Sequence, residues 1–248
     1  MTFRSTPAAW RRPTGTTLPA RFYQTVVGIL RLTGFYYLRN ERYAEIVSQL
    51  IGPSVAEGQL VVDLGCGPGG ITSKLSGPYS ILGLDRDRYL LRNFLDQRIP
   101  RIEGRGECLP FKNGSIDVVV AISLVEHMPD QAGFLREVAR VLKRGGRAIL
   151  QIPELRYPIE PHTKWPFLYL WSSAFQSKVL AATGYDDLDL STSAARVIQL
   201  GSESGLQVEQ TIPIWHFRLA KLIRRPMGFF IALKKPVDRR SPDYGASP

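Results

Sequence analysis

A carboxylate followed by closely spaced glycines is the feature of this chain best suited to bind a ligand. Val61 and Val62 are β-branched residues of the kind found in a buried parallel strand, and Asp63 follows them directly. Gly65 and Gly67 then leave the turn without side chains, so that the backbone can approach a ligand closely. A carboxylate here attracts a cationic amino group and repels a pyrophosphate. The pattern therefore predicts a ligand with a positive charge, although the same glycines also fit the less specific dinucleotide motif.

A second carboxylate stands at the end of the next apolar run. Residues 81–85 read Ile-Leu-Gly-Leu-Asp, which places Asp85 about twenty residues after the glycine turn. In a Rossmann-type sheet, an acid at this distance binds the hydroxyls of a ribose. The two acids together therefore predict a nucleoside ligand that also carries a cationic group.

The succession of motifs from residue 59 to residue 152 resembles the class I S-adenosylmethionine-dependent methyltransferases of the small-molecule, UbiE-like type. Glu107 stands where the family usually has Asp, and Ile116 stands where Phe is usual. The segments that carry the resemblance are the glycine turn at 63–70, the acidic strand end at 81–85, the loop at 106–111, the strand at 115–120, the pair Glu126-His127 and the turn and strand at 143–150.

The resemblance implies a fold, a cofactor and a set of site residues. The implied fold is α/β: a Rossmann-like, doubly wound, seven-stranded and mostly parallel sheet with helices on both faces. The implied cofactor is S-adenosyl-L-methionine, with the glycine turn at its amino-acid end, Asp85 at its ribose, and Glu107 and Cys108 at its adenine. No metal site is expected. The residues predicted to bind the cofactor are Asp63, Gly65, Cys66, Gly67, Asp85, Arg86, Glu107, Cys108 and Ile122.

Hydrophobic periodicity and turn residues divide the chain into three parts. We expect a flexible arm and N-terminal helices over 1–51, a methyltransferase domain over 52–235 with a lid insertion at 153–190, and a basic tail over 236–248. The expected strands are 59–64, 80–85, 101–104, 116–122, 146–152, 207–212 and 228–233, and the expected helices are one or two within 20–51, then 70–76, 87–97, 131–142 and 193–204.

The insertion holds Glu160 and His162, two of the three candidate catalytic residues. It leaves a strand end that should lie on the ligand side of the sheet, so it should roof the acceptor site. A hydroxyl acceptor needs a base, and histidine is best tuned for this near neutral pH. His162, oriented by Glu160, and His127 are the candidates. If the acceptor is an amine or a stabilised carbanion, the histidines only position it, and the insertion can also be a plain hydrophobic lid.

The positive charge of the chain is concentrated at its two ends. The formal net charge is +10, of which residues 1–50 carry +5 and residues 213–248 carry +6, whereas the middle carries −1. We expect peripheral contact with an anionic membrane through an amphipathic helix that starts at Trp215; nucleic acid is a less favoured partner. With no signal peptide, no apolar span and only two cysteines, the expected location is cytoplasmic.

The expected function is methyl transfer to a small-molecule, glycan or lipid-linked acceptor, at oxygen. Three alternatives stay open: an RNA or protein methyltransferase that uses the basic ends, a catalytically inactive binding module, and a nicotinamide oxidoreductase. The last fits poorly, because Asp63 would face a pyrophosphate.

Overall fold

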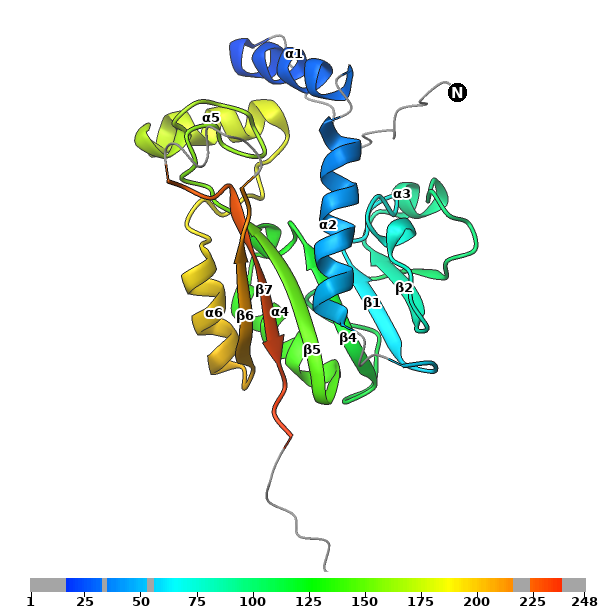
Figure 1. Cartoon of the computed structure of the whole chain (residues 1–248). Coiled ribbons are helices and arrows are strands. Elements are labelled where there is room, and N and C mark those ends of the chain that lie inside the picture. The colour runs from blue at the N-terminus through cyan, green and yellow to red at the C-terminus, as the bar shows by residue number, and fades with distance from the viewer. Residues whose placement is uncertain (1–16, 33–34, 53–55, 216–223, 238–248) are drawn as a thin grey trace, which may run out of the picture.

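The computed structural model describes residues 17–32, 35–52, 56–215 and 224–237. They form one seven-stranded sheet of order β3-β2-β1-β4-β5-β7-β6 (Figure 1). Strands β1 to β5 are parallel, whereas β7 runs antiparallel to both of its neighbours, β5 and β6. The predicted fold class is therefore confirmed. The strands are β1 Leu60–Leu64, β2 Ser80–Asp85, β3 Arg101–Glu103, β4 Ile116–Ile122, β5 Leu142–Pro153, β6 Gln207–Pro213 and β7 Gly228–Lys234.

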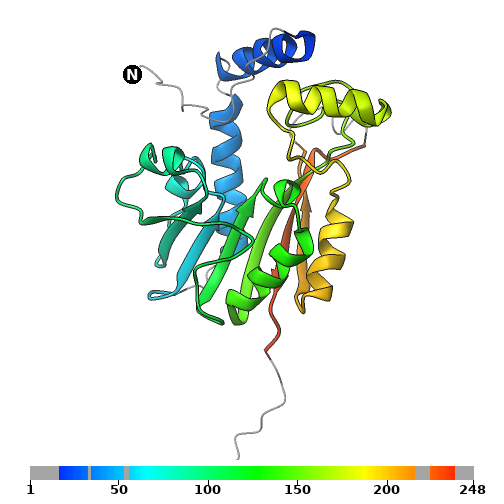
Figure 2. The ribbon, with the colours of Figure 1, turned by 180° about the vertical axis from the view of Figure 1, so that it is seen from behind.

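Helices cover both faces of the sheet and its ligand-side edge. Helix α2 lies on one face, and α4 and α6 lie on the other (Figures 1 and 2). Helices α1 and α5 lie beyond the carboxyl ends of the parallel strands and contact each other. The α-helices are α1 Leu18–Leu32, α2 Phe35–Ile51, α3 Arg88–Arg92, α4 Gln131–Val141, α5 Ser173–Thr183 and α6 Ala194–Glu203.

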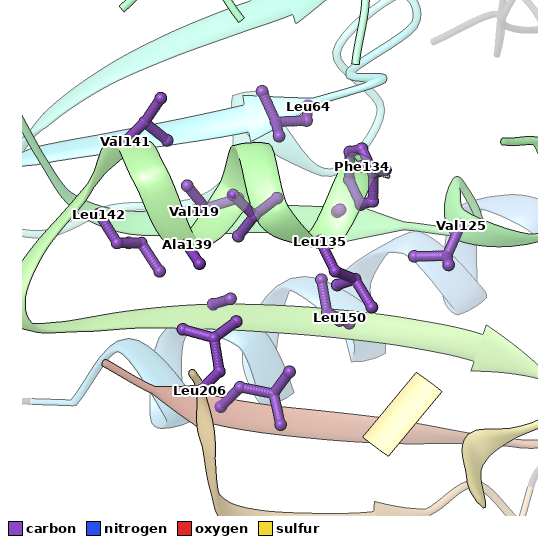
Figure 3. Packing of buried hydrophobic residues seen from close by; sticks show 14 of the residues in the cluster. Leu64, Val119, Val125, Phe134, Leu135, Ala139, Val141, Leu142, Leu150 and Leu206 are labelled. Atoms are coloured by element: carbon purple, nitrogen blue, oxygen red, sulfur yellow. The ribbon is translucent and has the colours of Figure 1, made fainter. Parts of the chain in front are cut away.

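The central strands carry apolar side chains on both faces because each face packs against a hydrophobic layer. On one side of the sheet, Val119 and Leu150 pack against Phe134 and Leu135 of α4, as Figure 3 shows. The alternate strand residues, such as Val118 and Ile149, belong to a second cluster that includes α2. This arrangement fixes the register of each strand, since a shift by one residue would exchange the two layers.

Two expected helices are shorter in the structure. The helix expected over 70–76 is only the 3₁₀ turn η1 Thr72–Lys74, because the preceding segment is a glycine turn that includes Gly69 at φ 78°. The helix expected over 87–97 ends at Arg92. Beyond the helix end, the Asp96 carboxylate accepts a hydrogen bond from the backbone N–H of Arg98. This bond stabilises a loop in a segment that was expected to be helical.

The N-terminal helix and the insertion form one structure above the sheet. The rings of Phe22 and Trp165 meet edge to face with centroids 5.4 Å apart. The hydroxyls of Tyr23 and Tyr185 lie 3.2 Å apart. The sequence did not predict this contact. It joins segments more than a hundred residues apart, and the local hydrophobic pattern of each segment does not indicate its partner.

Two expectations from the sequence concern membrane contact, the absence of a spanning helix and an amphipathic helix from Trp215 onward. None of the described helices is both long and apolar enough to cross a bilayer. The amphipathic helix expected from Trp215 onward depends on residues 216–223, which lie outside the described residues, so it stays a prediction.

A buried hydrogen bond ties the end of β1 to the turn that follows it. The Thr72 hydroxyl donates to the Asp63 carboxylate over 2.5 Å, and both side chains are almost completely buried. Burial raises the pKa of Asp63 to about 7, although the Thr72 hydrogen bond opposes this shift.

We expect the Asp63→Asn variant to change how stability depends on pH. The unfolded chain loses the Asp63 proton near pH 4, whereas the folded chain holds it to about pH 7, so folding takes up a proton between these values. The stabilising effect of Asp63 relative to Asn should therefore fall by about 1–2 kcal/mol as the pH rises from 5 to 7. Chemical denaturation of both proteins at each pH measures this difference.

The Thr72→Val variant is the matched test. It removes the hydrogen bond that lowers the pKa of Asp63, so this pKa should rise further. The loss of folding stability with rising pH should then extend to higher pH. A difference between wild type and Asp63→Asn that is constant or grows with pH would contradict the assignment.

Candidate active site

A cavity opens at the carboxyl ends of β1, β2 and β4, where an open α/β sheet binds ligands. Its floor is the strand ends and the glycine turn, and its far wall comes from the insertion, at Gly184, Tyr185 and Asp187. The wall has apolar side chains with a few acids between them. The side chains of Leu64, Leu84, Leu90, Leu124 and Met128 supply the apolar part, and Asp85, Asp87 and Glu107 supply carboxylates.

The glycine turn has the backbone geometry that its sequence implies. Gly65 has φ 69° and Gly67 has φ 54°, which glycine adopts at no steric cost. A Cβ on Gly65 would lie 2.8 Å from a methyl carbon of Leu124, which itself lines the cavity. A side chain at Gly65 would thus collide with the cavity wall.

Asp85 holds the turn and still has acceptor capacity. Its carboxylate accepts the N–H of Gly67 over 2.8 Å and the N–H of Asp87 over 2.8 Å, with one oxygen used for each. Each carboxylate oxygen can accept a further hydrogen bond, so Asp85 can also bind ligand hydroxyls. With apolar walls on either side and Glu107 at the cavity, the residues present fit an adenosyl group.

Of the other predicted cofactor residues, Arg86 lines the cavity, whereas Asp63, Cys66, Cys108 and Ile122 do not. Asp63 is bonded to Thr72, and Cys66 is buried against Leu91 and Phe94. Burial also raises the pKa of the Cys66 thiol. Ile122 is half-buried at the edge of the α2-side core, and the Cys108 side chain is exposed. Arg86 does line the cavity, where its guanidinium donates to Asp187 over 3.1 Å. Cofactor contact by these residues stays a prediction.

The three predicted catalytic residues come together at the far wall. The rings of His127 and His162 are 5.1 Å apart at an angle of 87°. His162 Nδ1 lies 3.0 Å from Glu160 Oε1, and His162 Nε2 lies 3.4 Å from Glu126 Oε1. His127 Nδ1 lies 3.2 Å from Asp187 Oδ1. The insertion thus brings His162 to His127 of η2 Val125–His127.

The carboxylates control the charge of His162. Burial alone would lower the pKa of this imidazole, but Glu126 and Glu160 raise it to about 9. Burial would raise the pKa of Glu160, but hydrogen bonds from His162 and Thr163 hold it at about 2. Both groups are therefore charged at neutral pH, and Glu160 acts as the residue that orients His162.

Sequence reasoning missed Asp187, Tyr185 and the role of Glu126. Asp187 and Tyr185 lie about sixty residues beyond η2, in a segment with no motif of its own. Glu126 had a signal, because it stands beside His127 in the motif, but only the fold shows that it also faces His162.

Comparisons with known proteins agree with this geometry. Residues 62–150 match the family described as methyltransferase domain. A protein of Mycolicibacterium smegmatis, named as an S-adenosylmethionine-dependent methyltransferase, is 29% identical over 219 residues, with 86% of this chain and 76% of the relative covered. A demethylmenaquinone methyltransferase of Corynebacterium kroppenstedtii is 27% identical, with 64% of this chain but only 62% of the relative covered.

Two solved structures share the fold. The S-adenosylmethionine-dependent methyltransferase of Mesorhizobium loti superposes with a TM-score of 0.58 at 19% identity, with 77% of this chain and 97% of that chain covered. The phosphoethanolamine N-methyltransferase 2 of Haemonchus contortus, solved with S-adenosylhomocysteine, gives a TM-score of 0.59 at 15% identity, with 79% of this chain and 53% of that chain covered. The domain match, the sheet order and the cavity at its strand ends lead to one conclusion: residues 62–150 carry a methyltransferase domain on a Rossmann-like methyltransferase sheet, which supports an S-adenosylmethionine-dependent methyltransferase.

Proposed function

We propose that the protein methylates a hydroxyl oxygen of a small-molecule, glycan or lipid-linked acceptor. The observation that carries the proposal is the cluster of Glu126, His127 and His162, of which His127 lines the cofactor cavity. Titratable groups gathered there are suited to bind a hydroxyl and take its proton. Methylation of a carbanion or a neutral amine does not need such a cluster.

The cofactor site follows from the cavity floor. Asp85 would bind the ribose hydroxyls, Glu107 would lie at the adenine side, and the glycine turn would allow close approach of the backbone. The bound cofactor supplies a methyl group on a positively charged sulfur. Attack of the acceptor oxygen on that methyl carbon would leave the electron pair of the carbon–sulfur bond on sulfur, and the hydroxyl proton would pass to His127, the member of the cluster that lines the cavity.

Alignment and exclusion of water are the other contributions of the protein. Tyr185 contacts both imidazole rings, with centroids 6.3 Å from His127 and 5.3 Å from His162. Helix α1 covers the insertion through Phe22 and Tyr23. These contacts hold the cluster in place above the cofactor site.

Apolar side chains beside this roof favour an acceptor with a lipid part. Leu32 is 90% exposed and Leu170 is 71% exposed, and Phe167 and Trp171 are also exposed. Two relatives that match only part of this chain are named as a demethylmenaquinone methyltransferase and a sterol 24-C-methyltransferase, names that point to acceptors with apolar parts. Contact with an anionic membrane through the basic ends would suit the same class of acceptor.

RNA is the second candidate acceptor. A relative in Dictyostelium discoideum, 31% identical over 149 residues, is named as an 18S rRNA (guanine-N(7))-methyltransferase. The positive ends of this chain suit nucleic acid as well as lipid. A methyl-label screen of lipid, glycan and RNA extracts separates the two, and label in RNA alone would overturn the proposal.

The Asp85→Asn variant tests the cofactor site. Loss of a hydrogen bond to a charged group costs about 1.5–3 kcal/mol, so we expect the affinity for S-adenosylhomocysteine to fall by about 10- to 150-fold. Isothermal titration calorimetry measures this change. Glu103→Gln, an acid at the end of β3 outside the cavity wall, is the matched control and should bind as wild type. Stronger thermal stabilisation by NADH than by S-adenosylhomocysteine would contradict the assignment.

The His162→Ala variant tests the cluster. His162 is charged at neutral pH, so it would assist proton transfer by orienting the acceptor oxygen and the group that takes its proton. Loss of a group that assists proton transfer usually lowers turnover by about 10²–10⁴-fold, and cofactor affinity should stay nearly unchanged because Asp85 is untouched. Turnover with the acceptor found in the screen, together with S-adenosylhomocysteine binding, gives both values. Lys178→Ala, an exposed change on α5 of the same insertion, is the control. Full turnover in His162→Ala would contradict a catalytic role for His162 and would mean that the insertion contributes only packing.

A further inference from the structure

We propose that Glu126, His127 and His162 bind one divalent transition-metal ion of the Zn²⁺ class. Each residue offers a ligand atom, and these atoms all lie within 4.8 Å of one another. Two imidazoles and one carboxylate form a donor set used in catalytic zinc sites and in non-haem iron sites. Mg²⁺ and Ca²⁺ prefer oxygen ligands alone, so the two nitrogens favour a transition metal.

The carboxylate of Glu126 is the strongest independent sign of a cation. This side chain is completely buried, and neither of its oxygens accepts a hydrogen bond from any residue that the structure describes. Its nearest charged group is His162, at 3.4 Å. The charged His162 ring offsets part of the cost of burying this carboxylate, but no hydrogen bond from the described residues satisfies its oxygens, and direct coordination to a cation would do so.

Both imidazoles are held in the way that metal-binding histidines are held. Nδ1 of His162 is bonded to Glu160, and Nδ1 of His127 is bonded to Asp187. The other nitrogen of each ring is therefore the one that can serve as a ligand, and for His162, which is charged at neutral pH, the ion would have to displace the proton on that nitrogen. Carboxylates behind ligand histidines fix the ring orientation and raise the basicity of the ligand nitrogen.

The spacing needs only a small adjustment. Ligand atoms about 2.1 Å from a tetrahedral ion lie about 3.4 Å apart. His162 Nε2 and Glu126 Oε1 already have this separation, at 3.4 Å. His127 belongs to the same 3₁₀ turn as Glu126, and its ligand atom lies within 4.8 Å of the other two.

Three protein ligands leave at least one coordination position for another atom. His127 lines the cofactor cavity, so this position is on the side where an acceptor would enter. An acceptor hydroxyl bound to the ion would be more acidic than in water. This role of the ion rests on the proposed function, whereas ion binding itself does not.

Metal titration of the full chain, after treatment with a chelator, tests the site. We expect one Zn²⁺ per chain by calorimetry and visible absorption bands when Co²⁺ is used instead. Glu126→Gln and His162→Gln should each weaken Zn²⁺ binding by at least about 100-fold, and Asp187→Asn by about 10- to 100-fold, the usual range for a residue behind a ligand. Glu57→Gln, an exposed acid before β1, should bind as wild type.

Binding of S-adenosylhomocysteine by each variant shows that it is folded. The absence of stoichiometric Zn²⁺ binding, or equal binding by wild type and a folded Glu126→Gln, would overturn the metal site. Failure of the proposed function is distinguishable: stoichiometric Zn²⁺ lost in Glu126→Gln, with no methylation of any hydroxyl acceptor, supports the metal site and contradicts oxygen methylation. Hydroxyl methylation by a protein that binds no Zn²⁺ would support oxygen methylation and contradict the metal site.

Discussion

The buried carboxylate of Glu160 is the interaction on which the acceptor side of this protein depends. A charge removed from water is tolerated only when its acceptor sites are filled. Here the backbone N–H groups of His162 and Thr163, the Thr163 hydroxyl and the His162 ring all surround it. These donors lie within three residues of the acid, so satisfying one charge also shapes the turn that presents His162. The insertion therefore needs little regular secondary structure to place a side chain accurately.

The parallel sheet supplies the complementary constraint on the cofactor side. Because β1, β2 and β4 run in the same direction, their carboxyl ends meet at one edge and bring Asp85 to the glycine turn. The same edge carries η2, and so His127, next to the cavity. The cofactor side and the acceptor side are thus separate structures that share a boundary at His127.

The local patterns of the sequence predicted most of the fold, and the long-range contacts explain what they did not predict. Continuous apolar runs such as 116–122 gave the strands with nearly their observed bounds, because burial on both faces leaves a clear signal. The insertion was expected to roof the pocket because it leaves a strand end on the ligand side, and the structure brings its His162 to His127. Asp187 and the packing of Phe22 on Trp165 were missed, since each depends on a partner about sixty or more residues away that no periodicity records.

The contact between α1 and the insertion has a consequence for how such enzymes can diversify. Phe22 and Tyr23 touch the insertion at Trp165 and Tyr185, so the two segments bury each other's aromatic surface. A chimera that receives the insertion of a relative but keeps this α1 would lose that fit and expose aromatic side chains. Under the proposed function, a change of acceptor would therefore require both distant segments to be exchanged together, while the sheet beneath them stays the same.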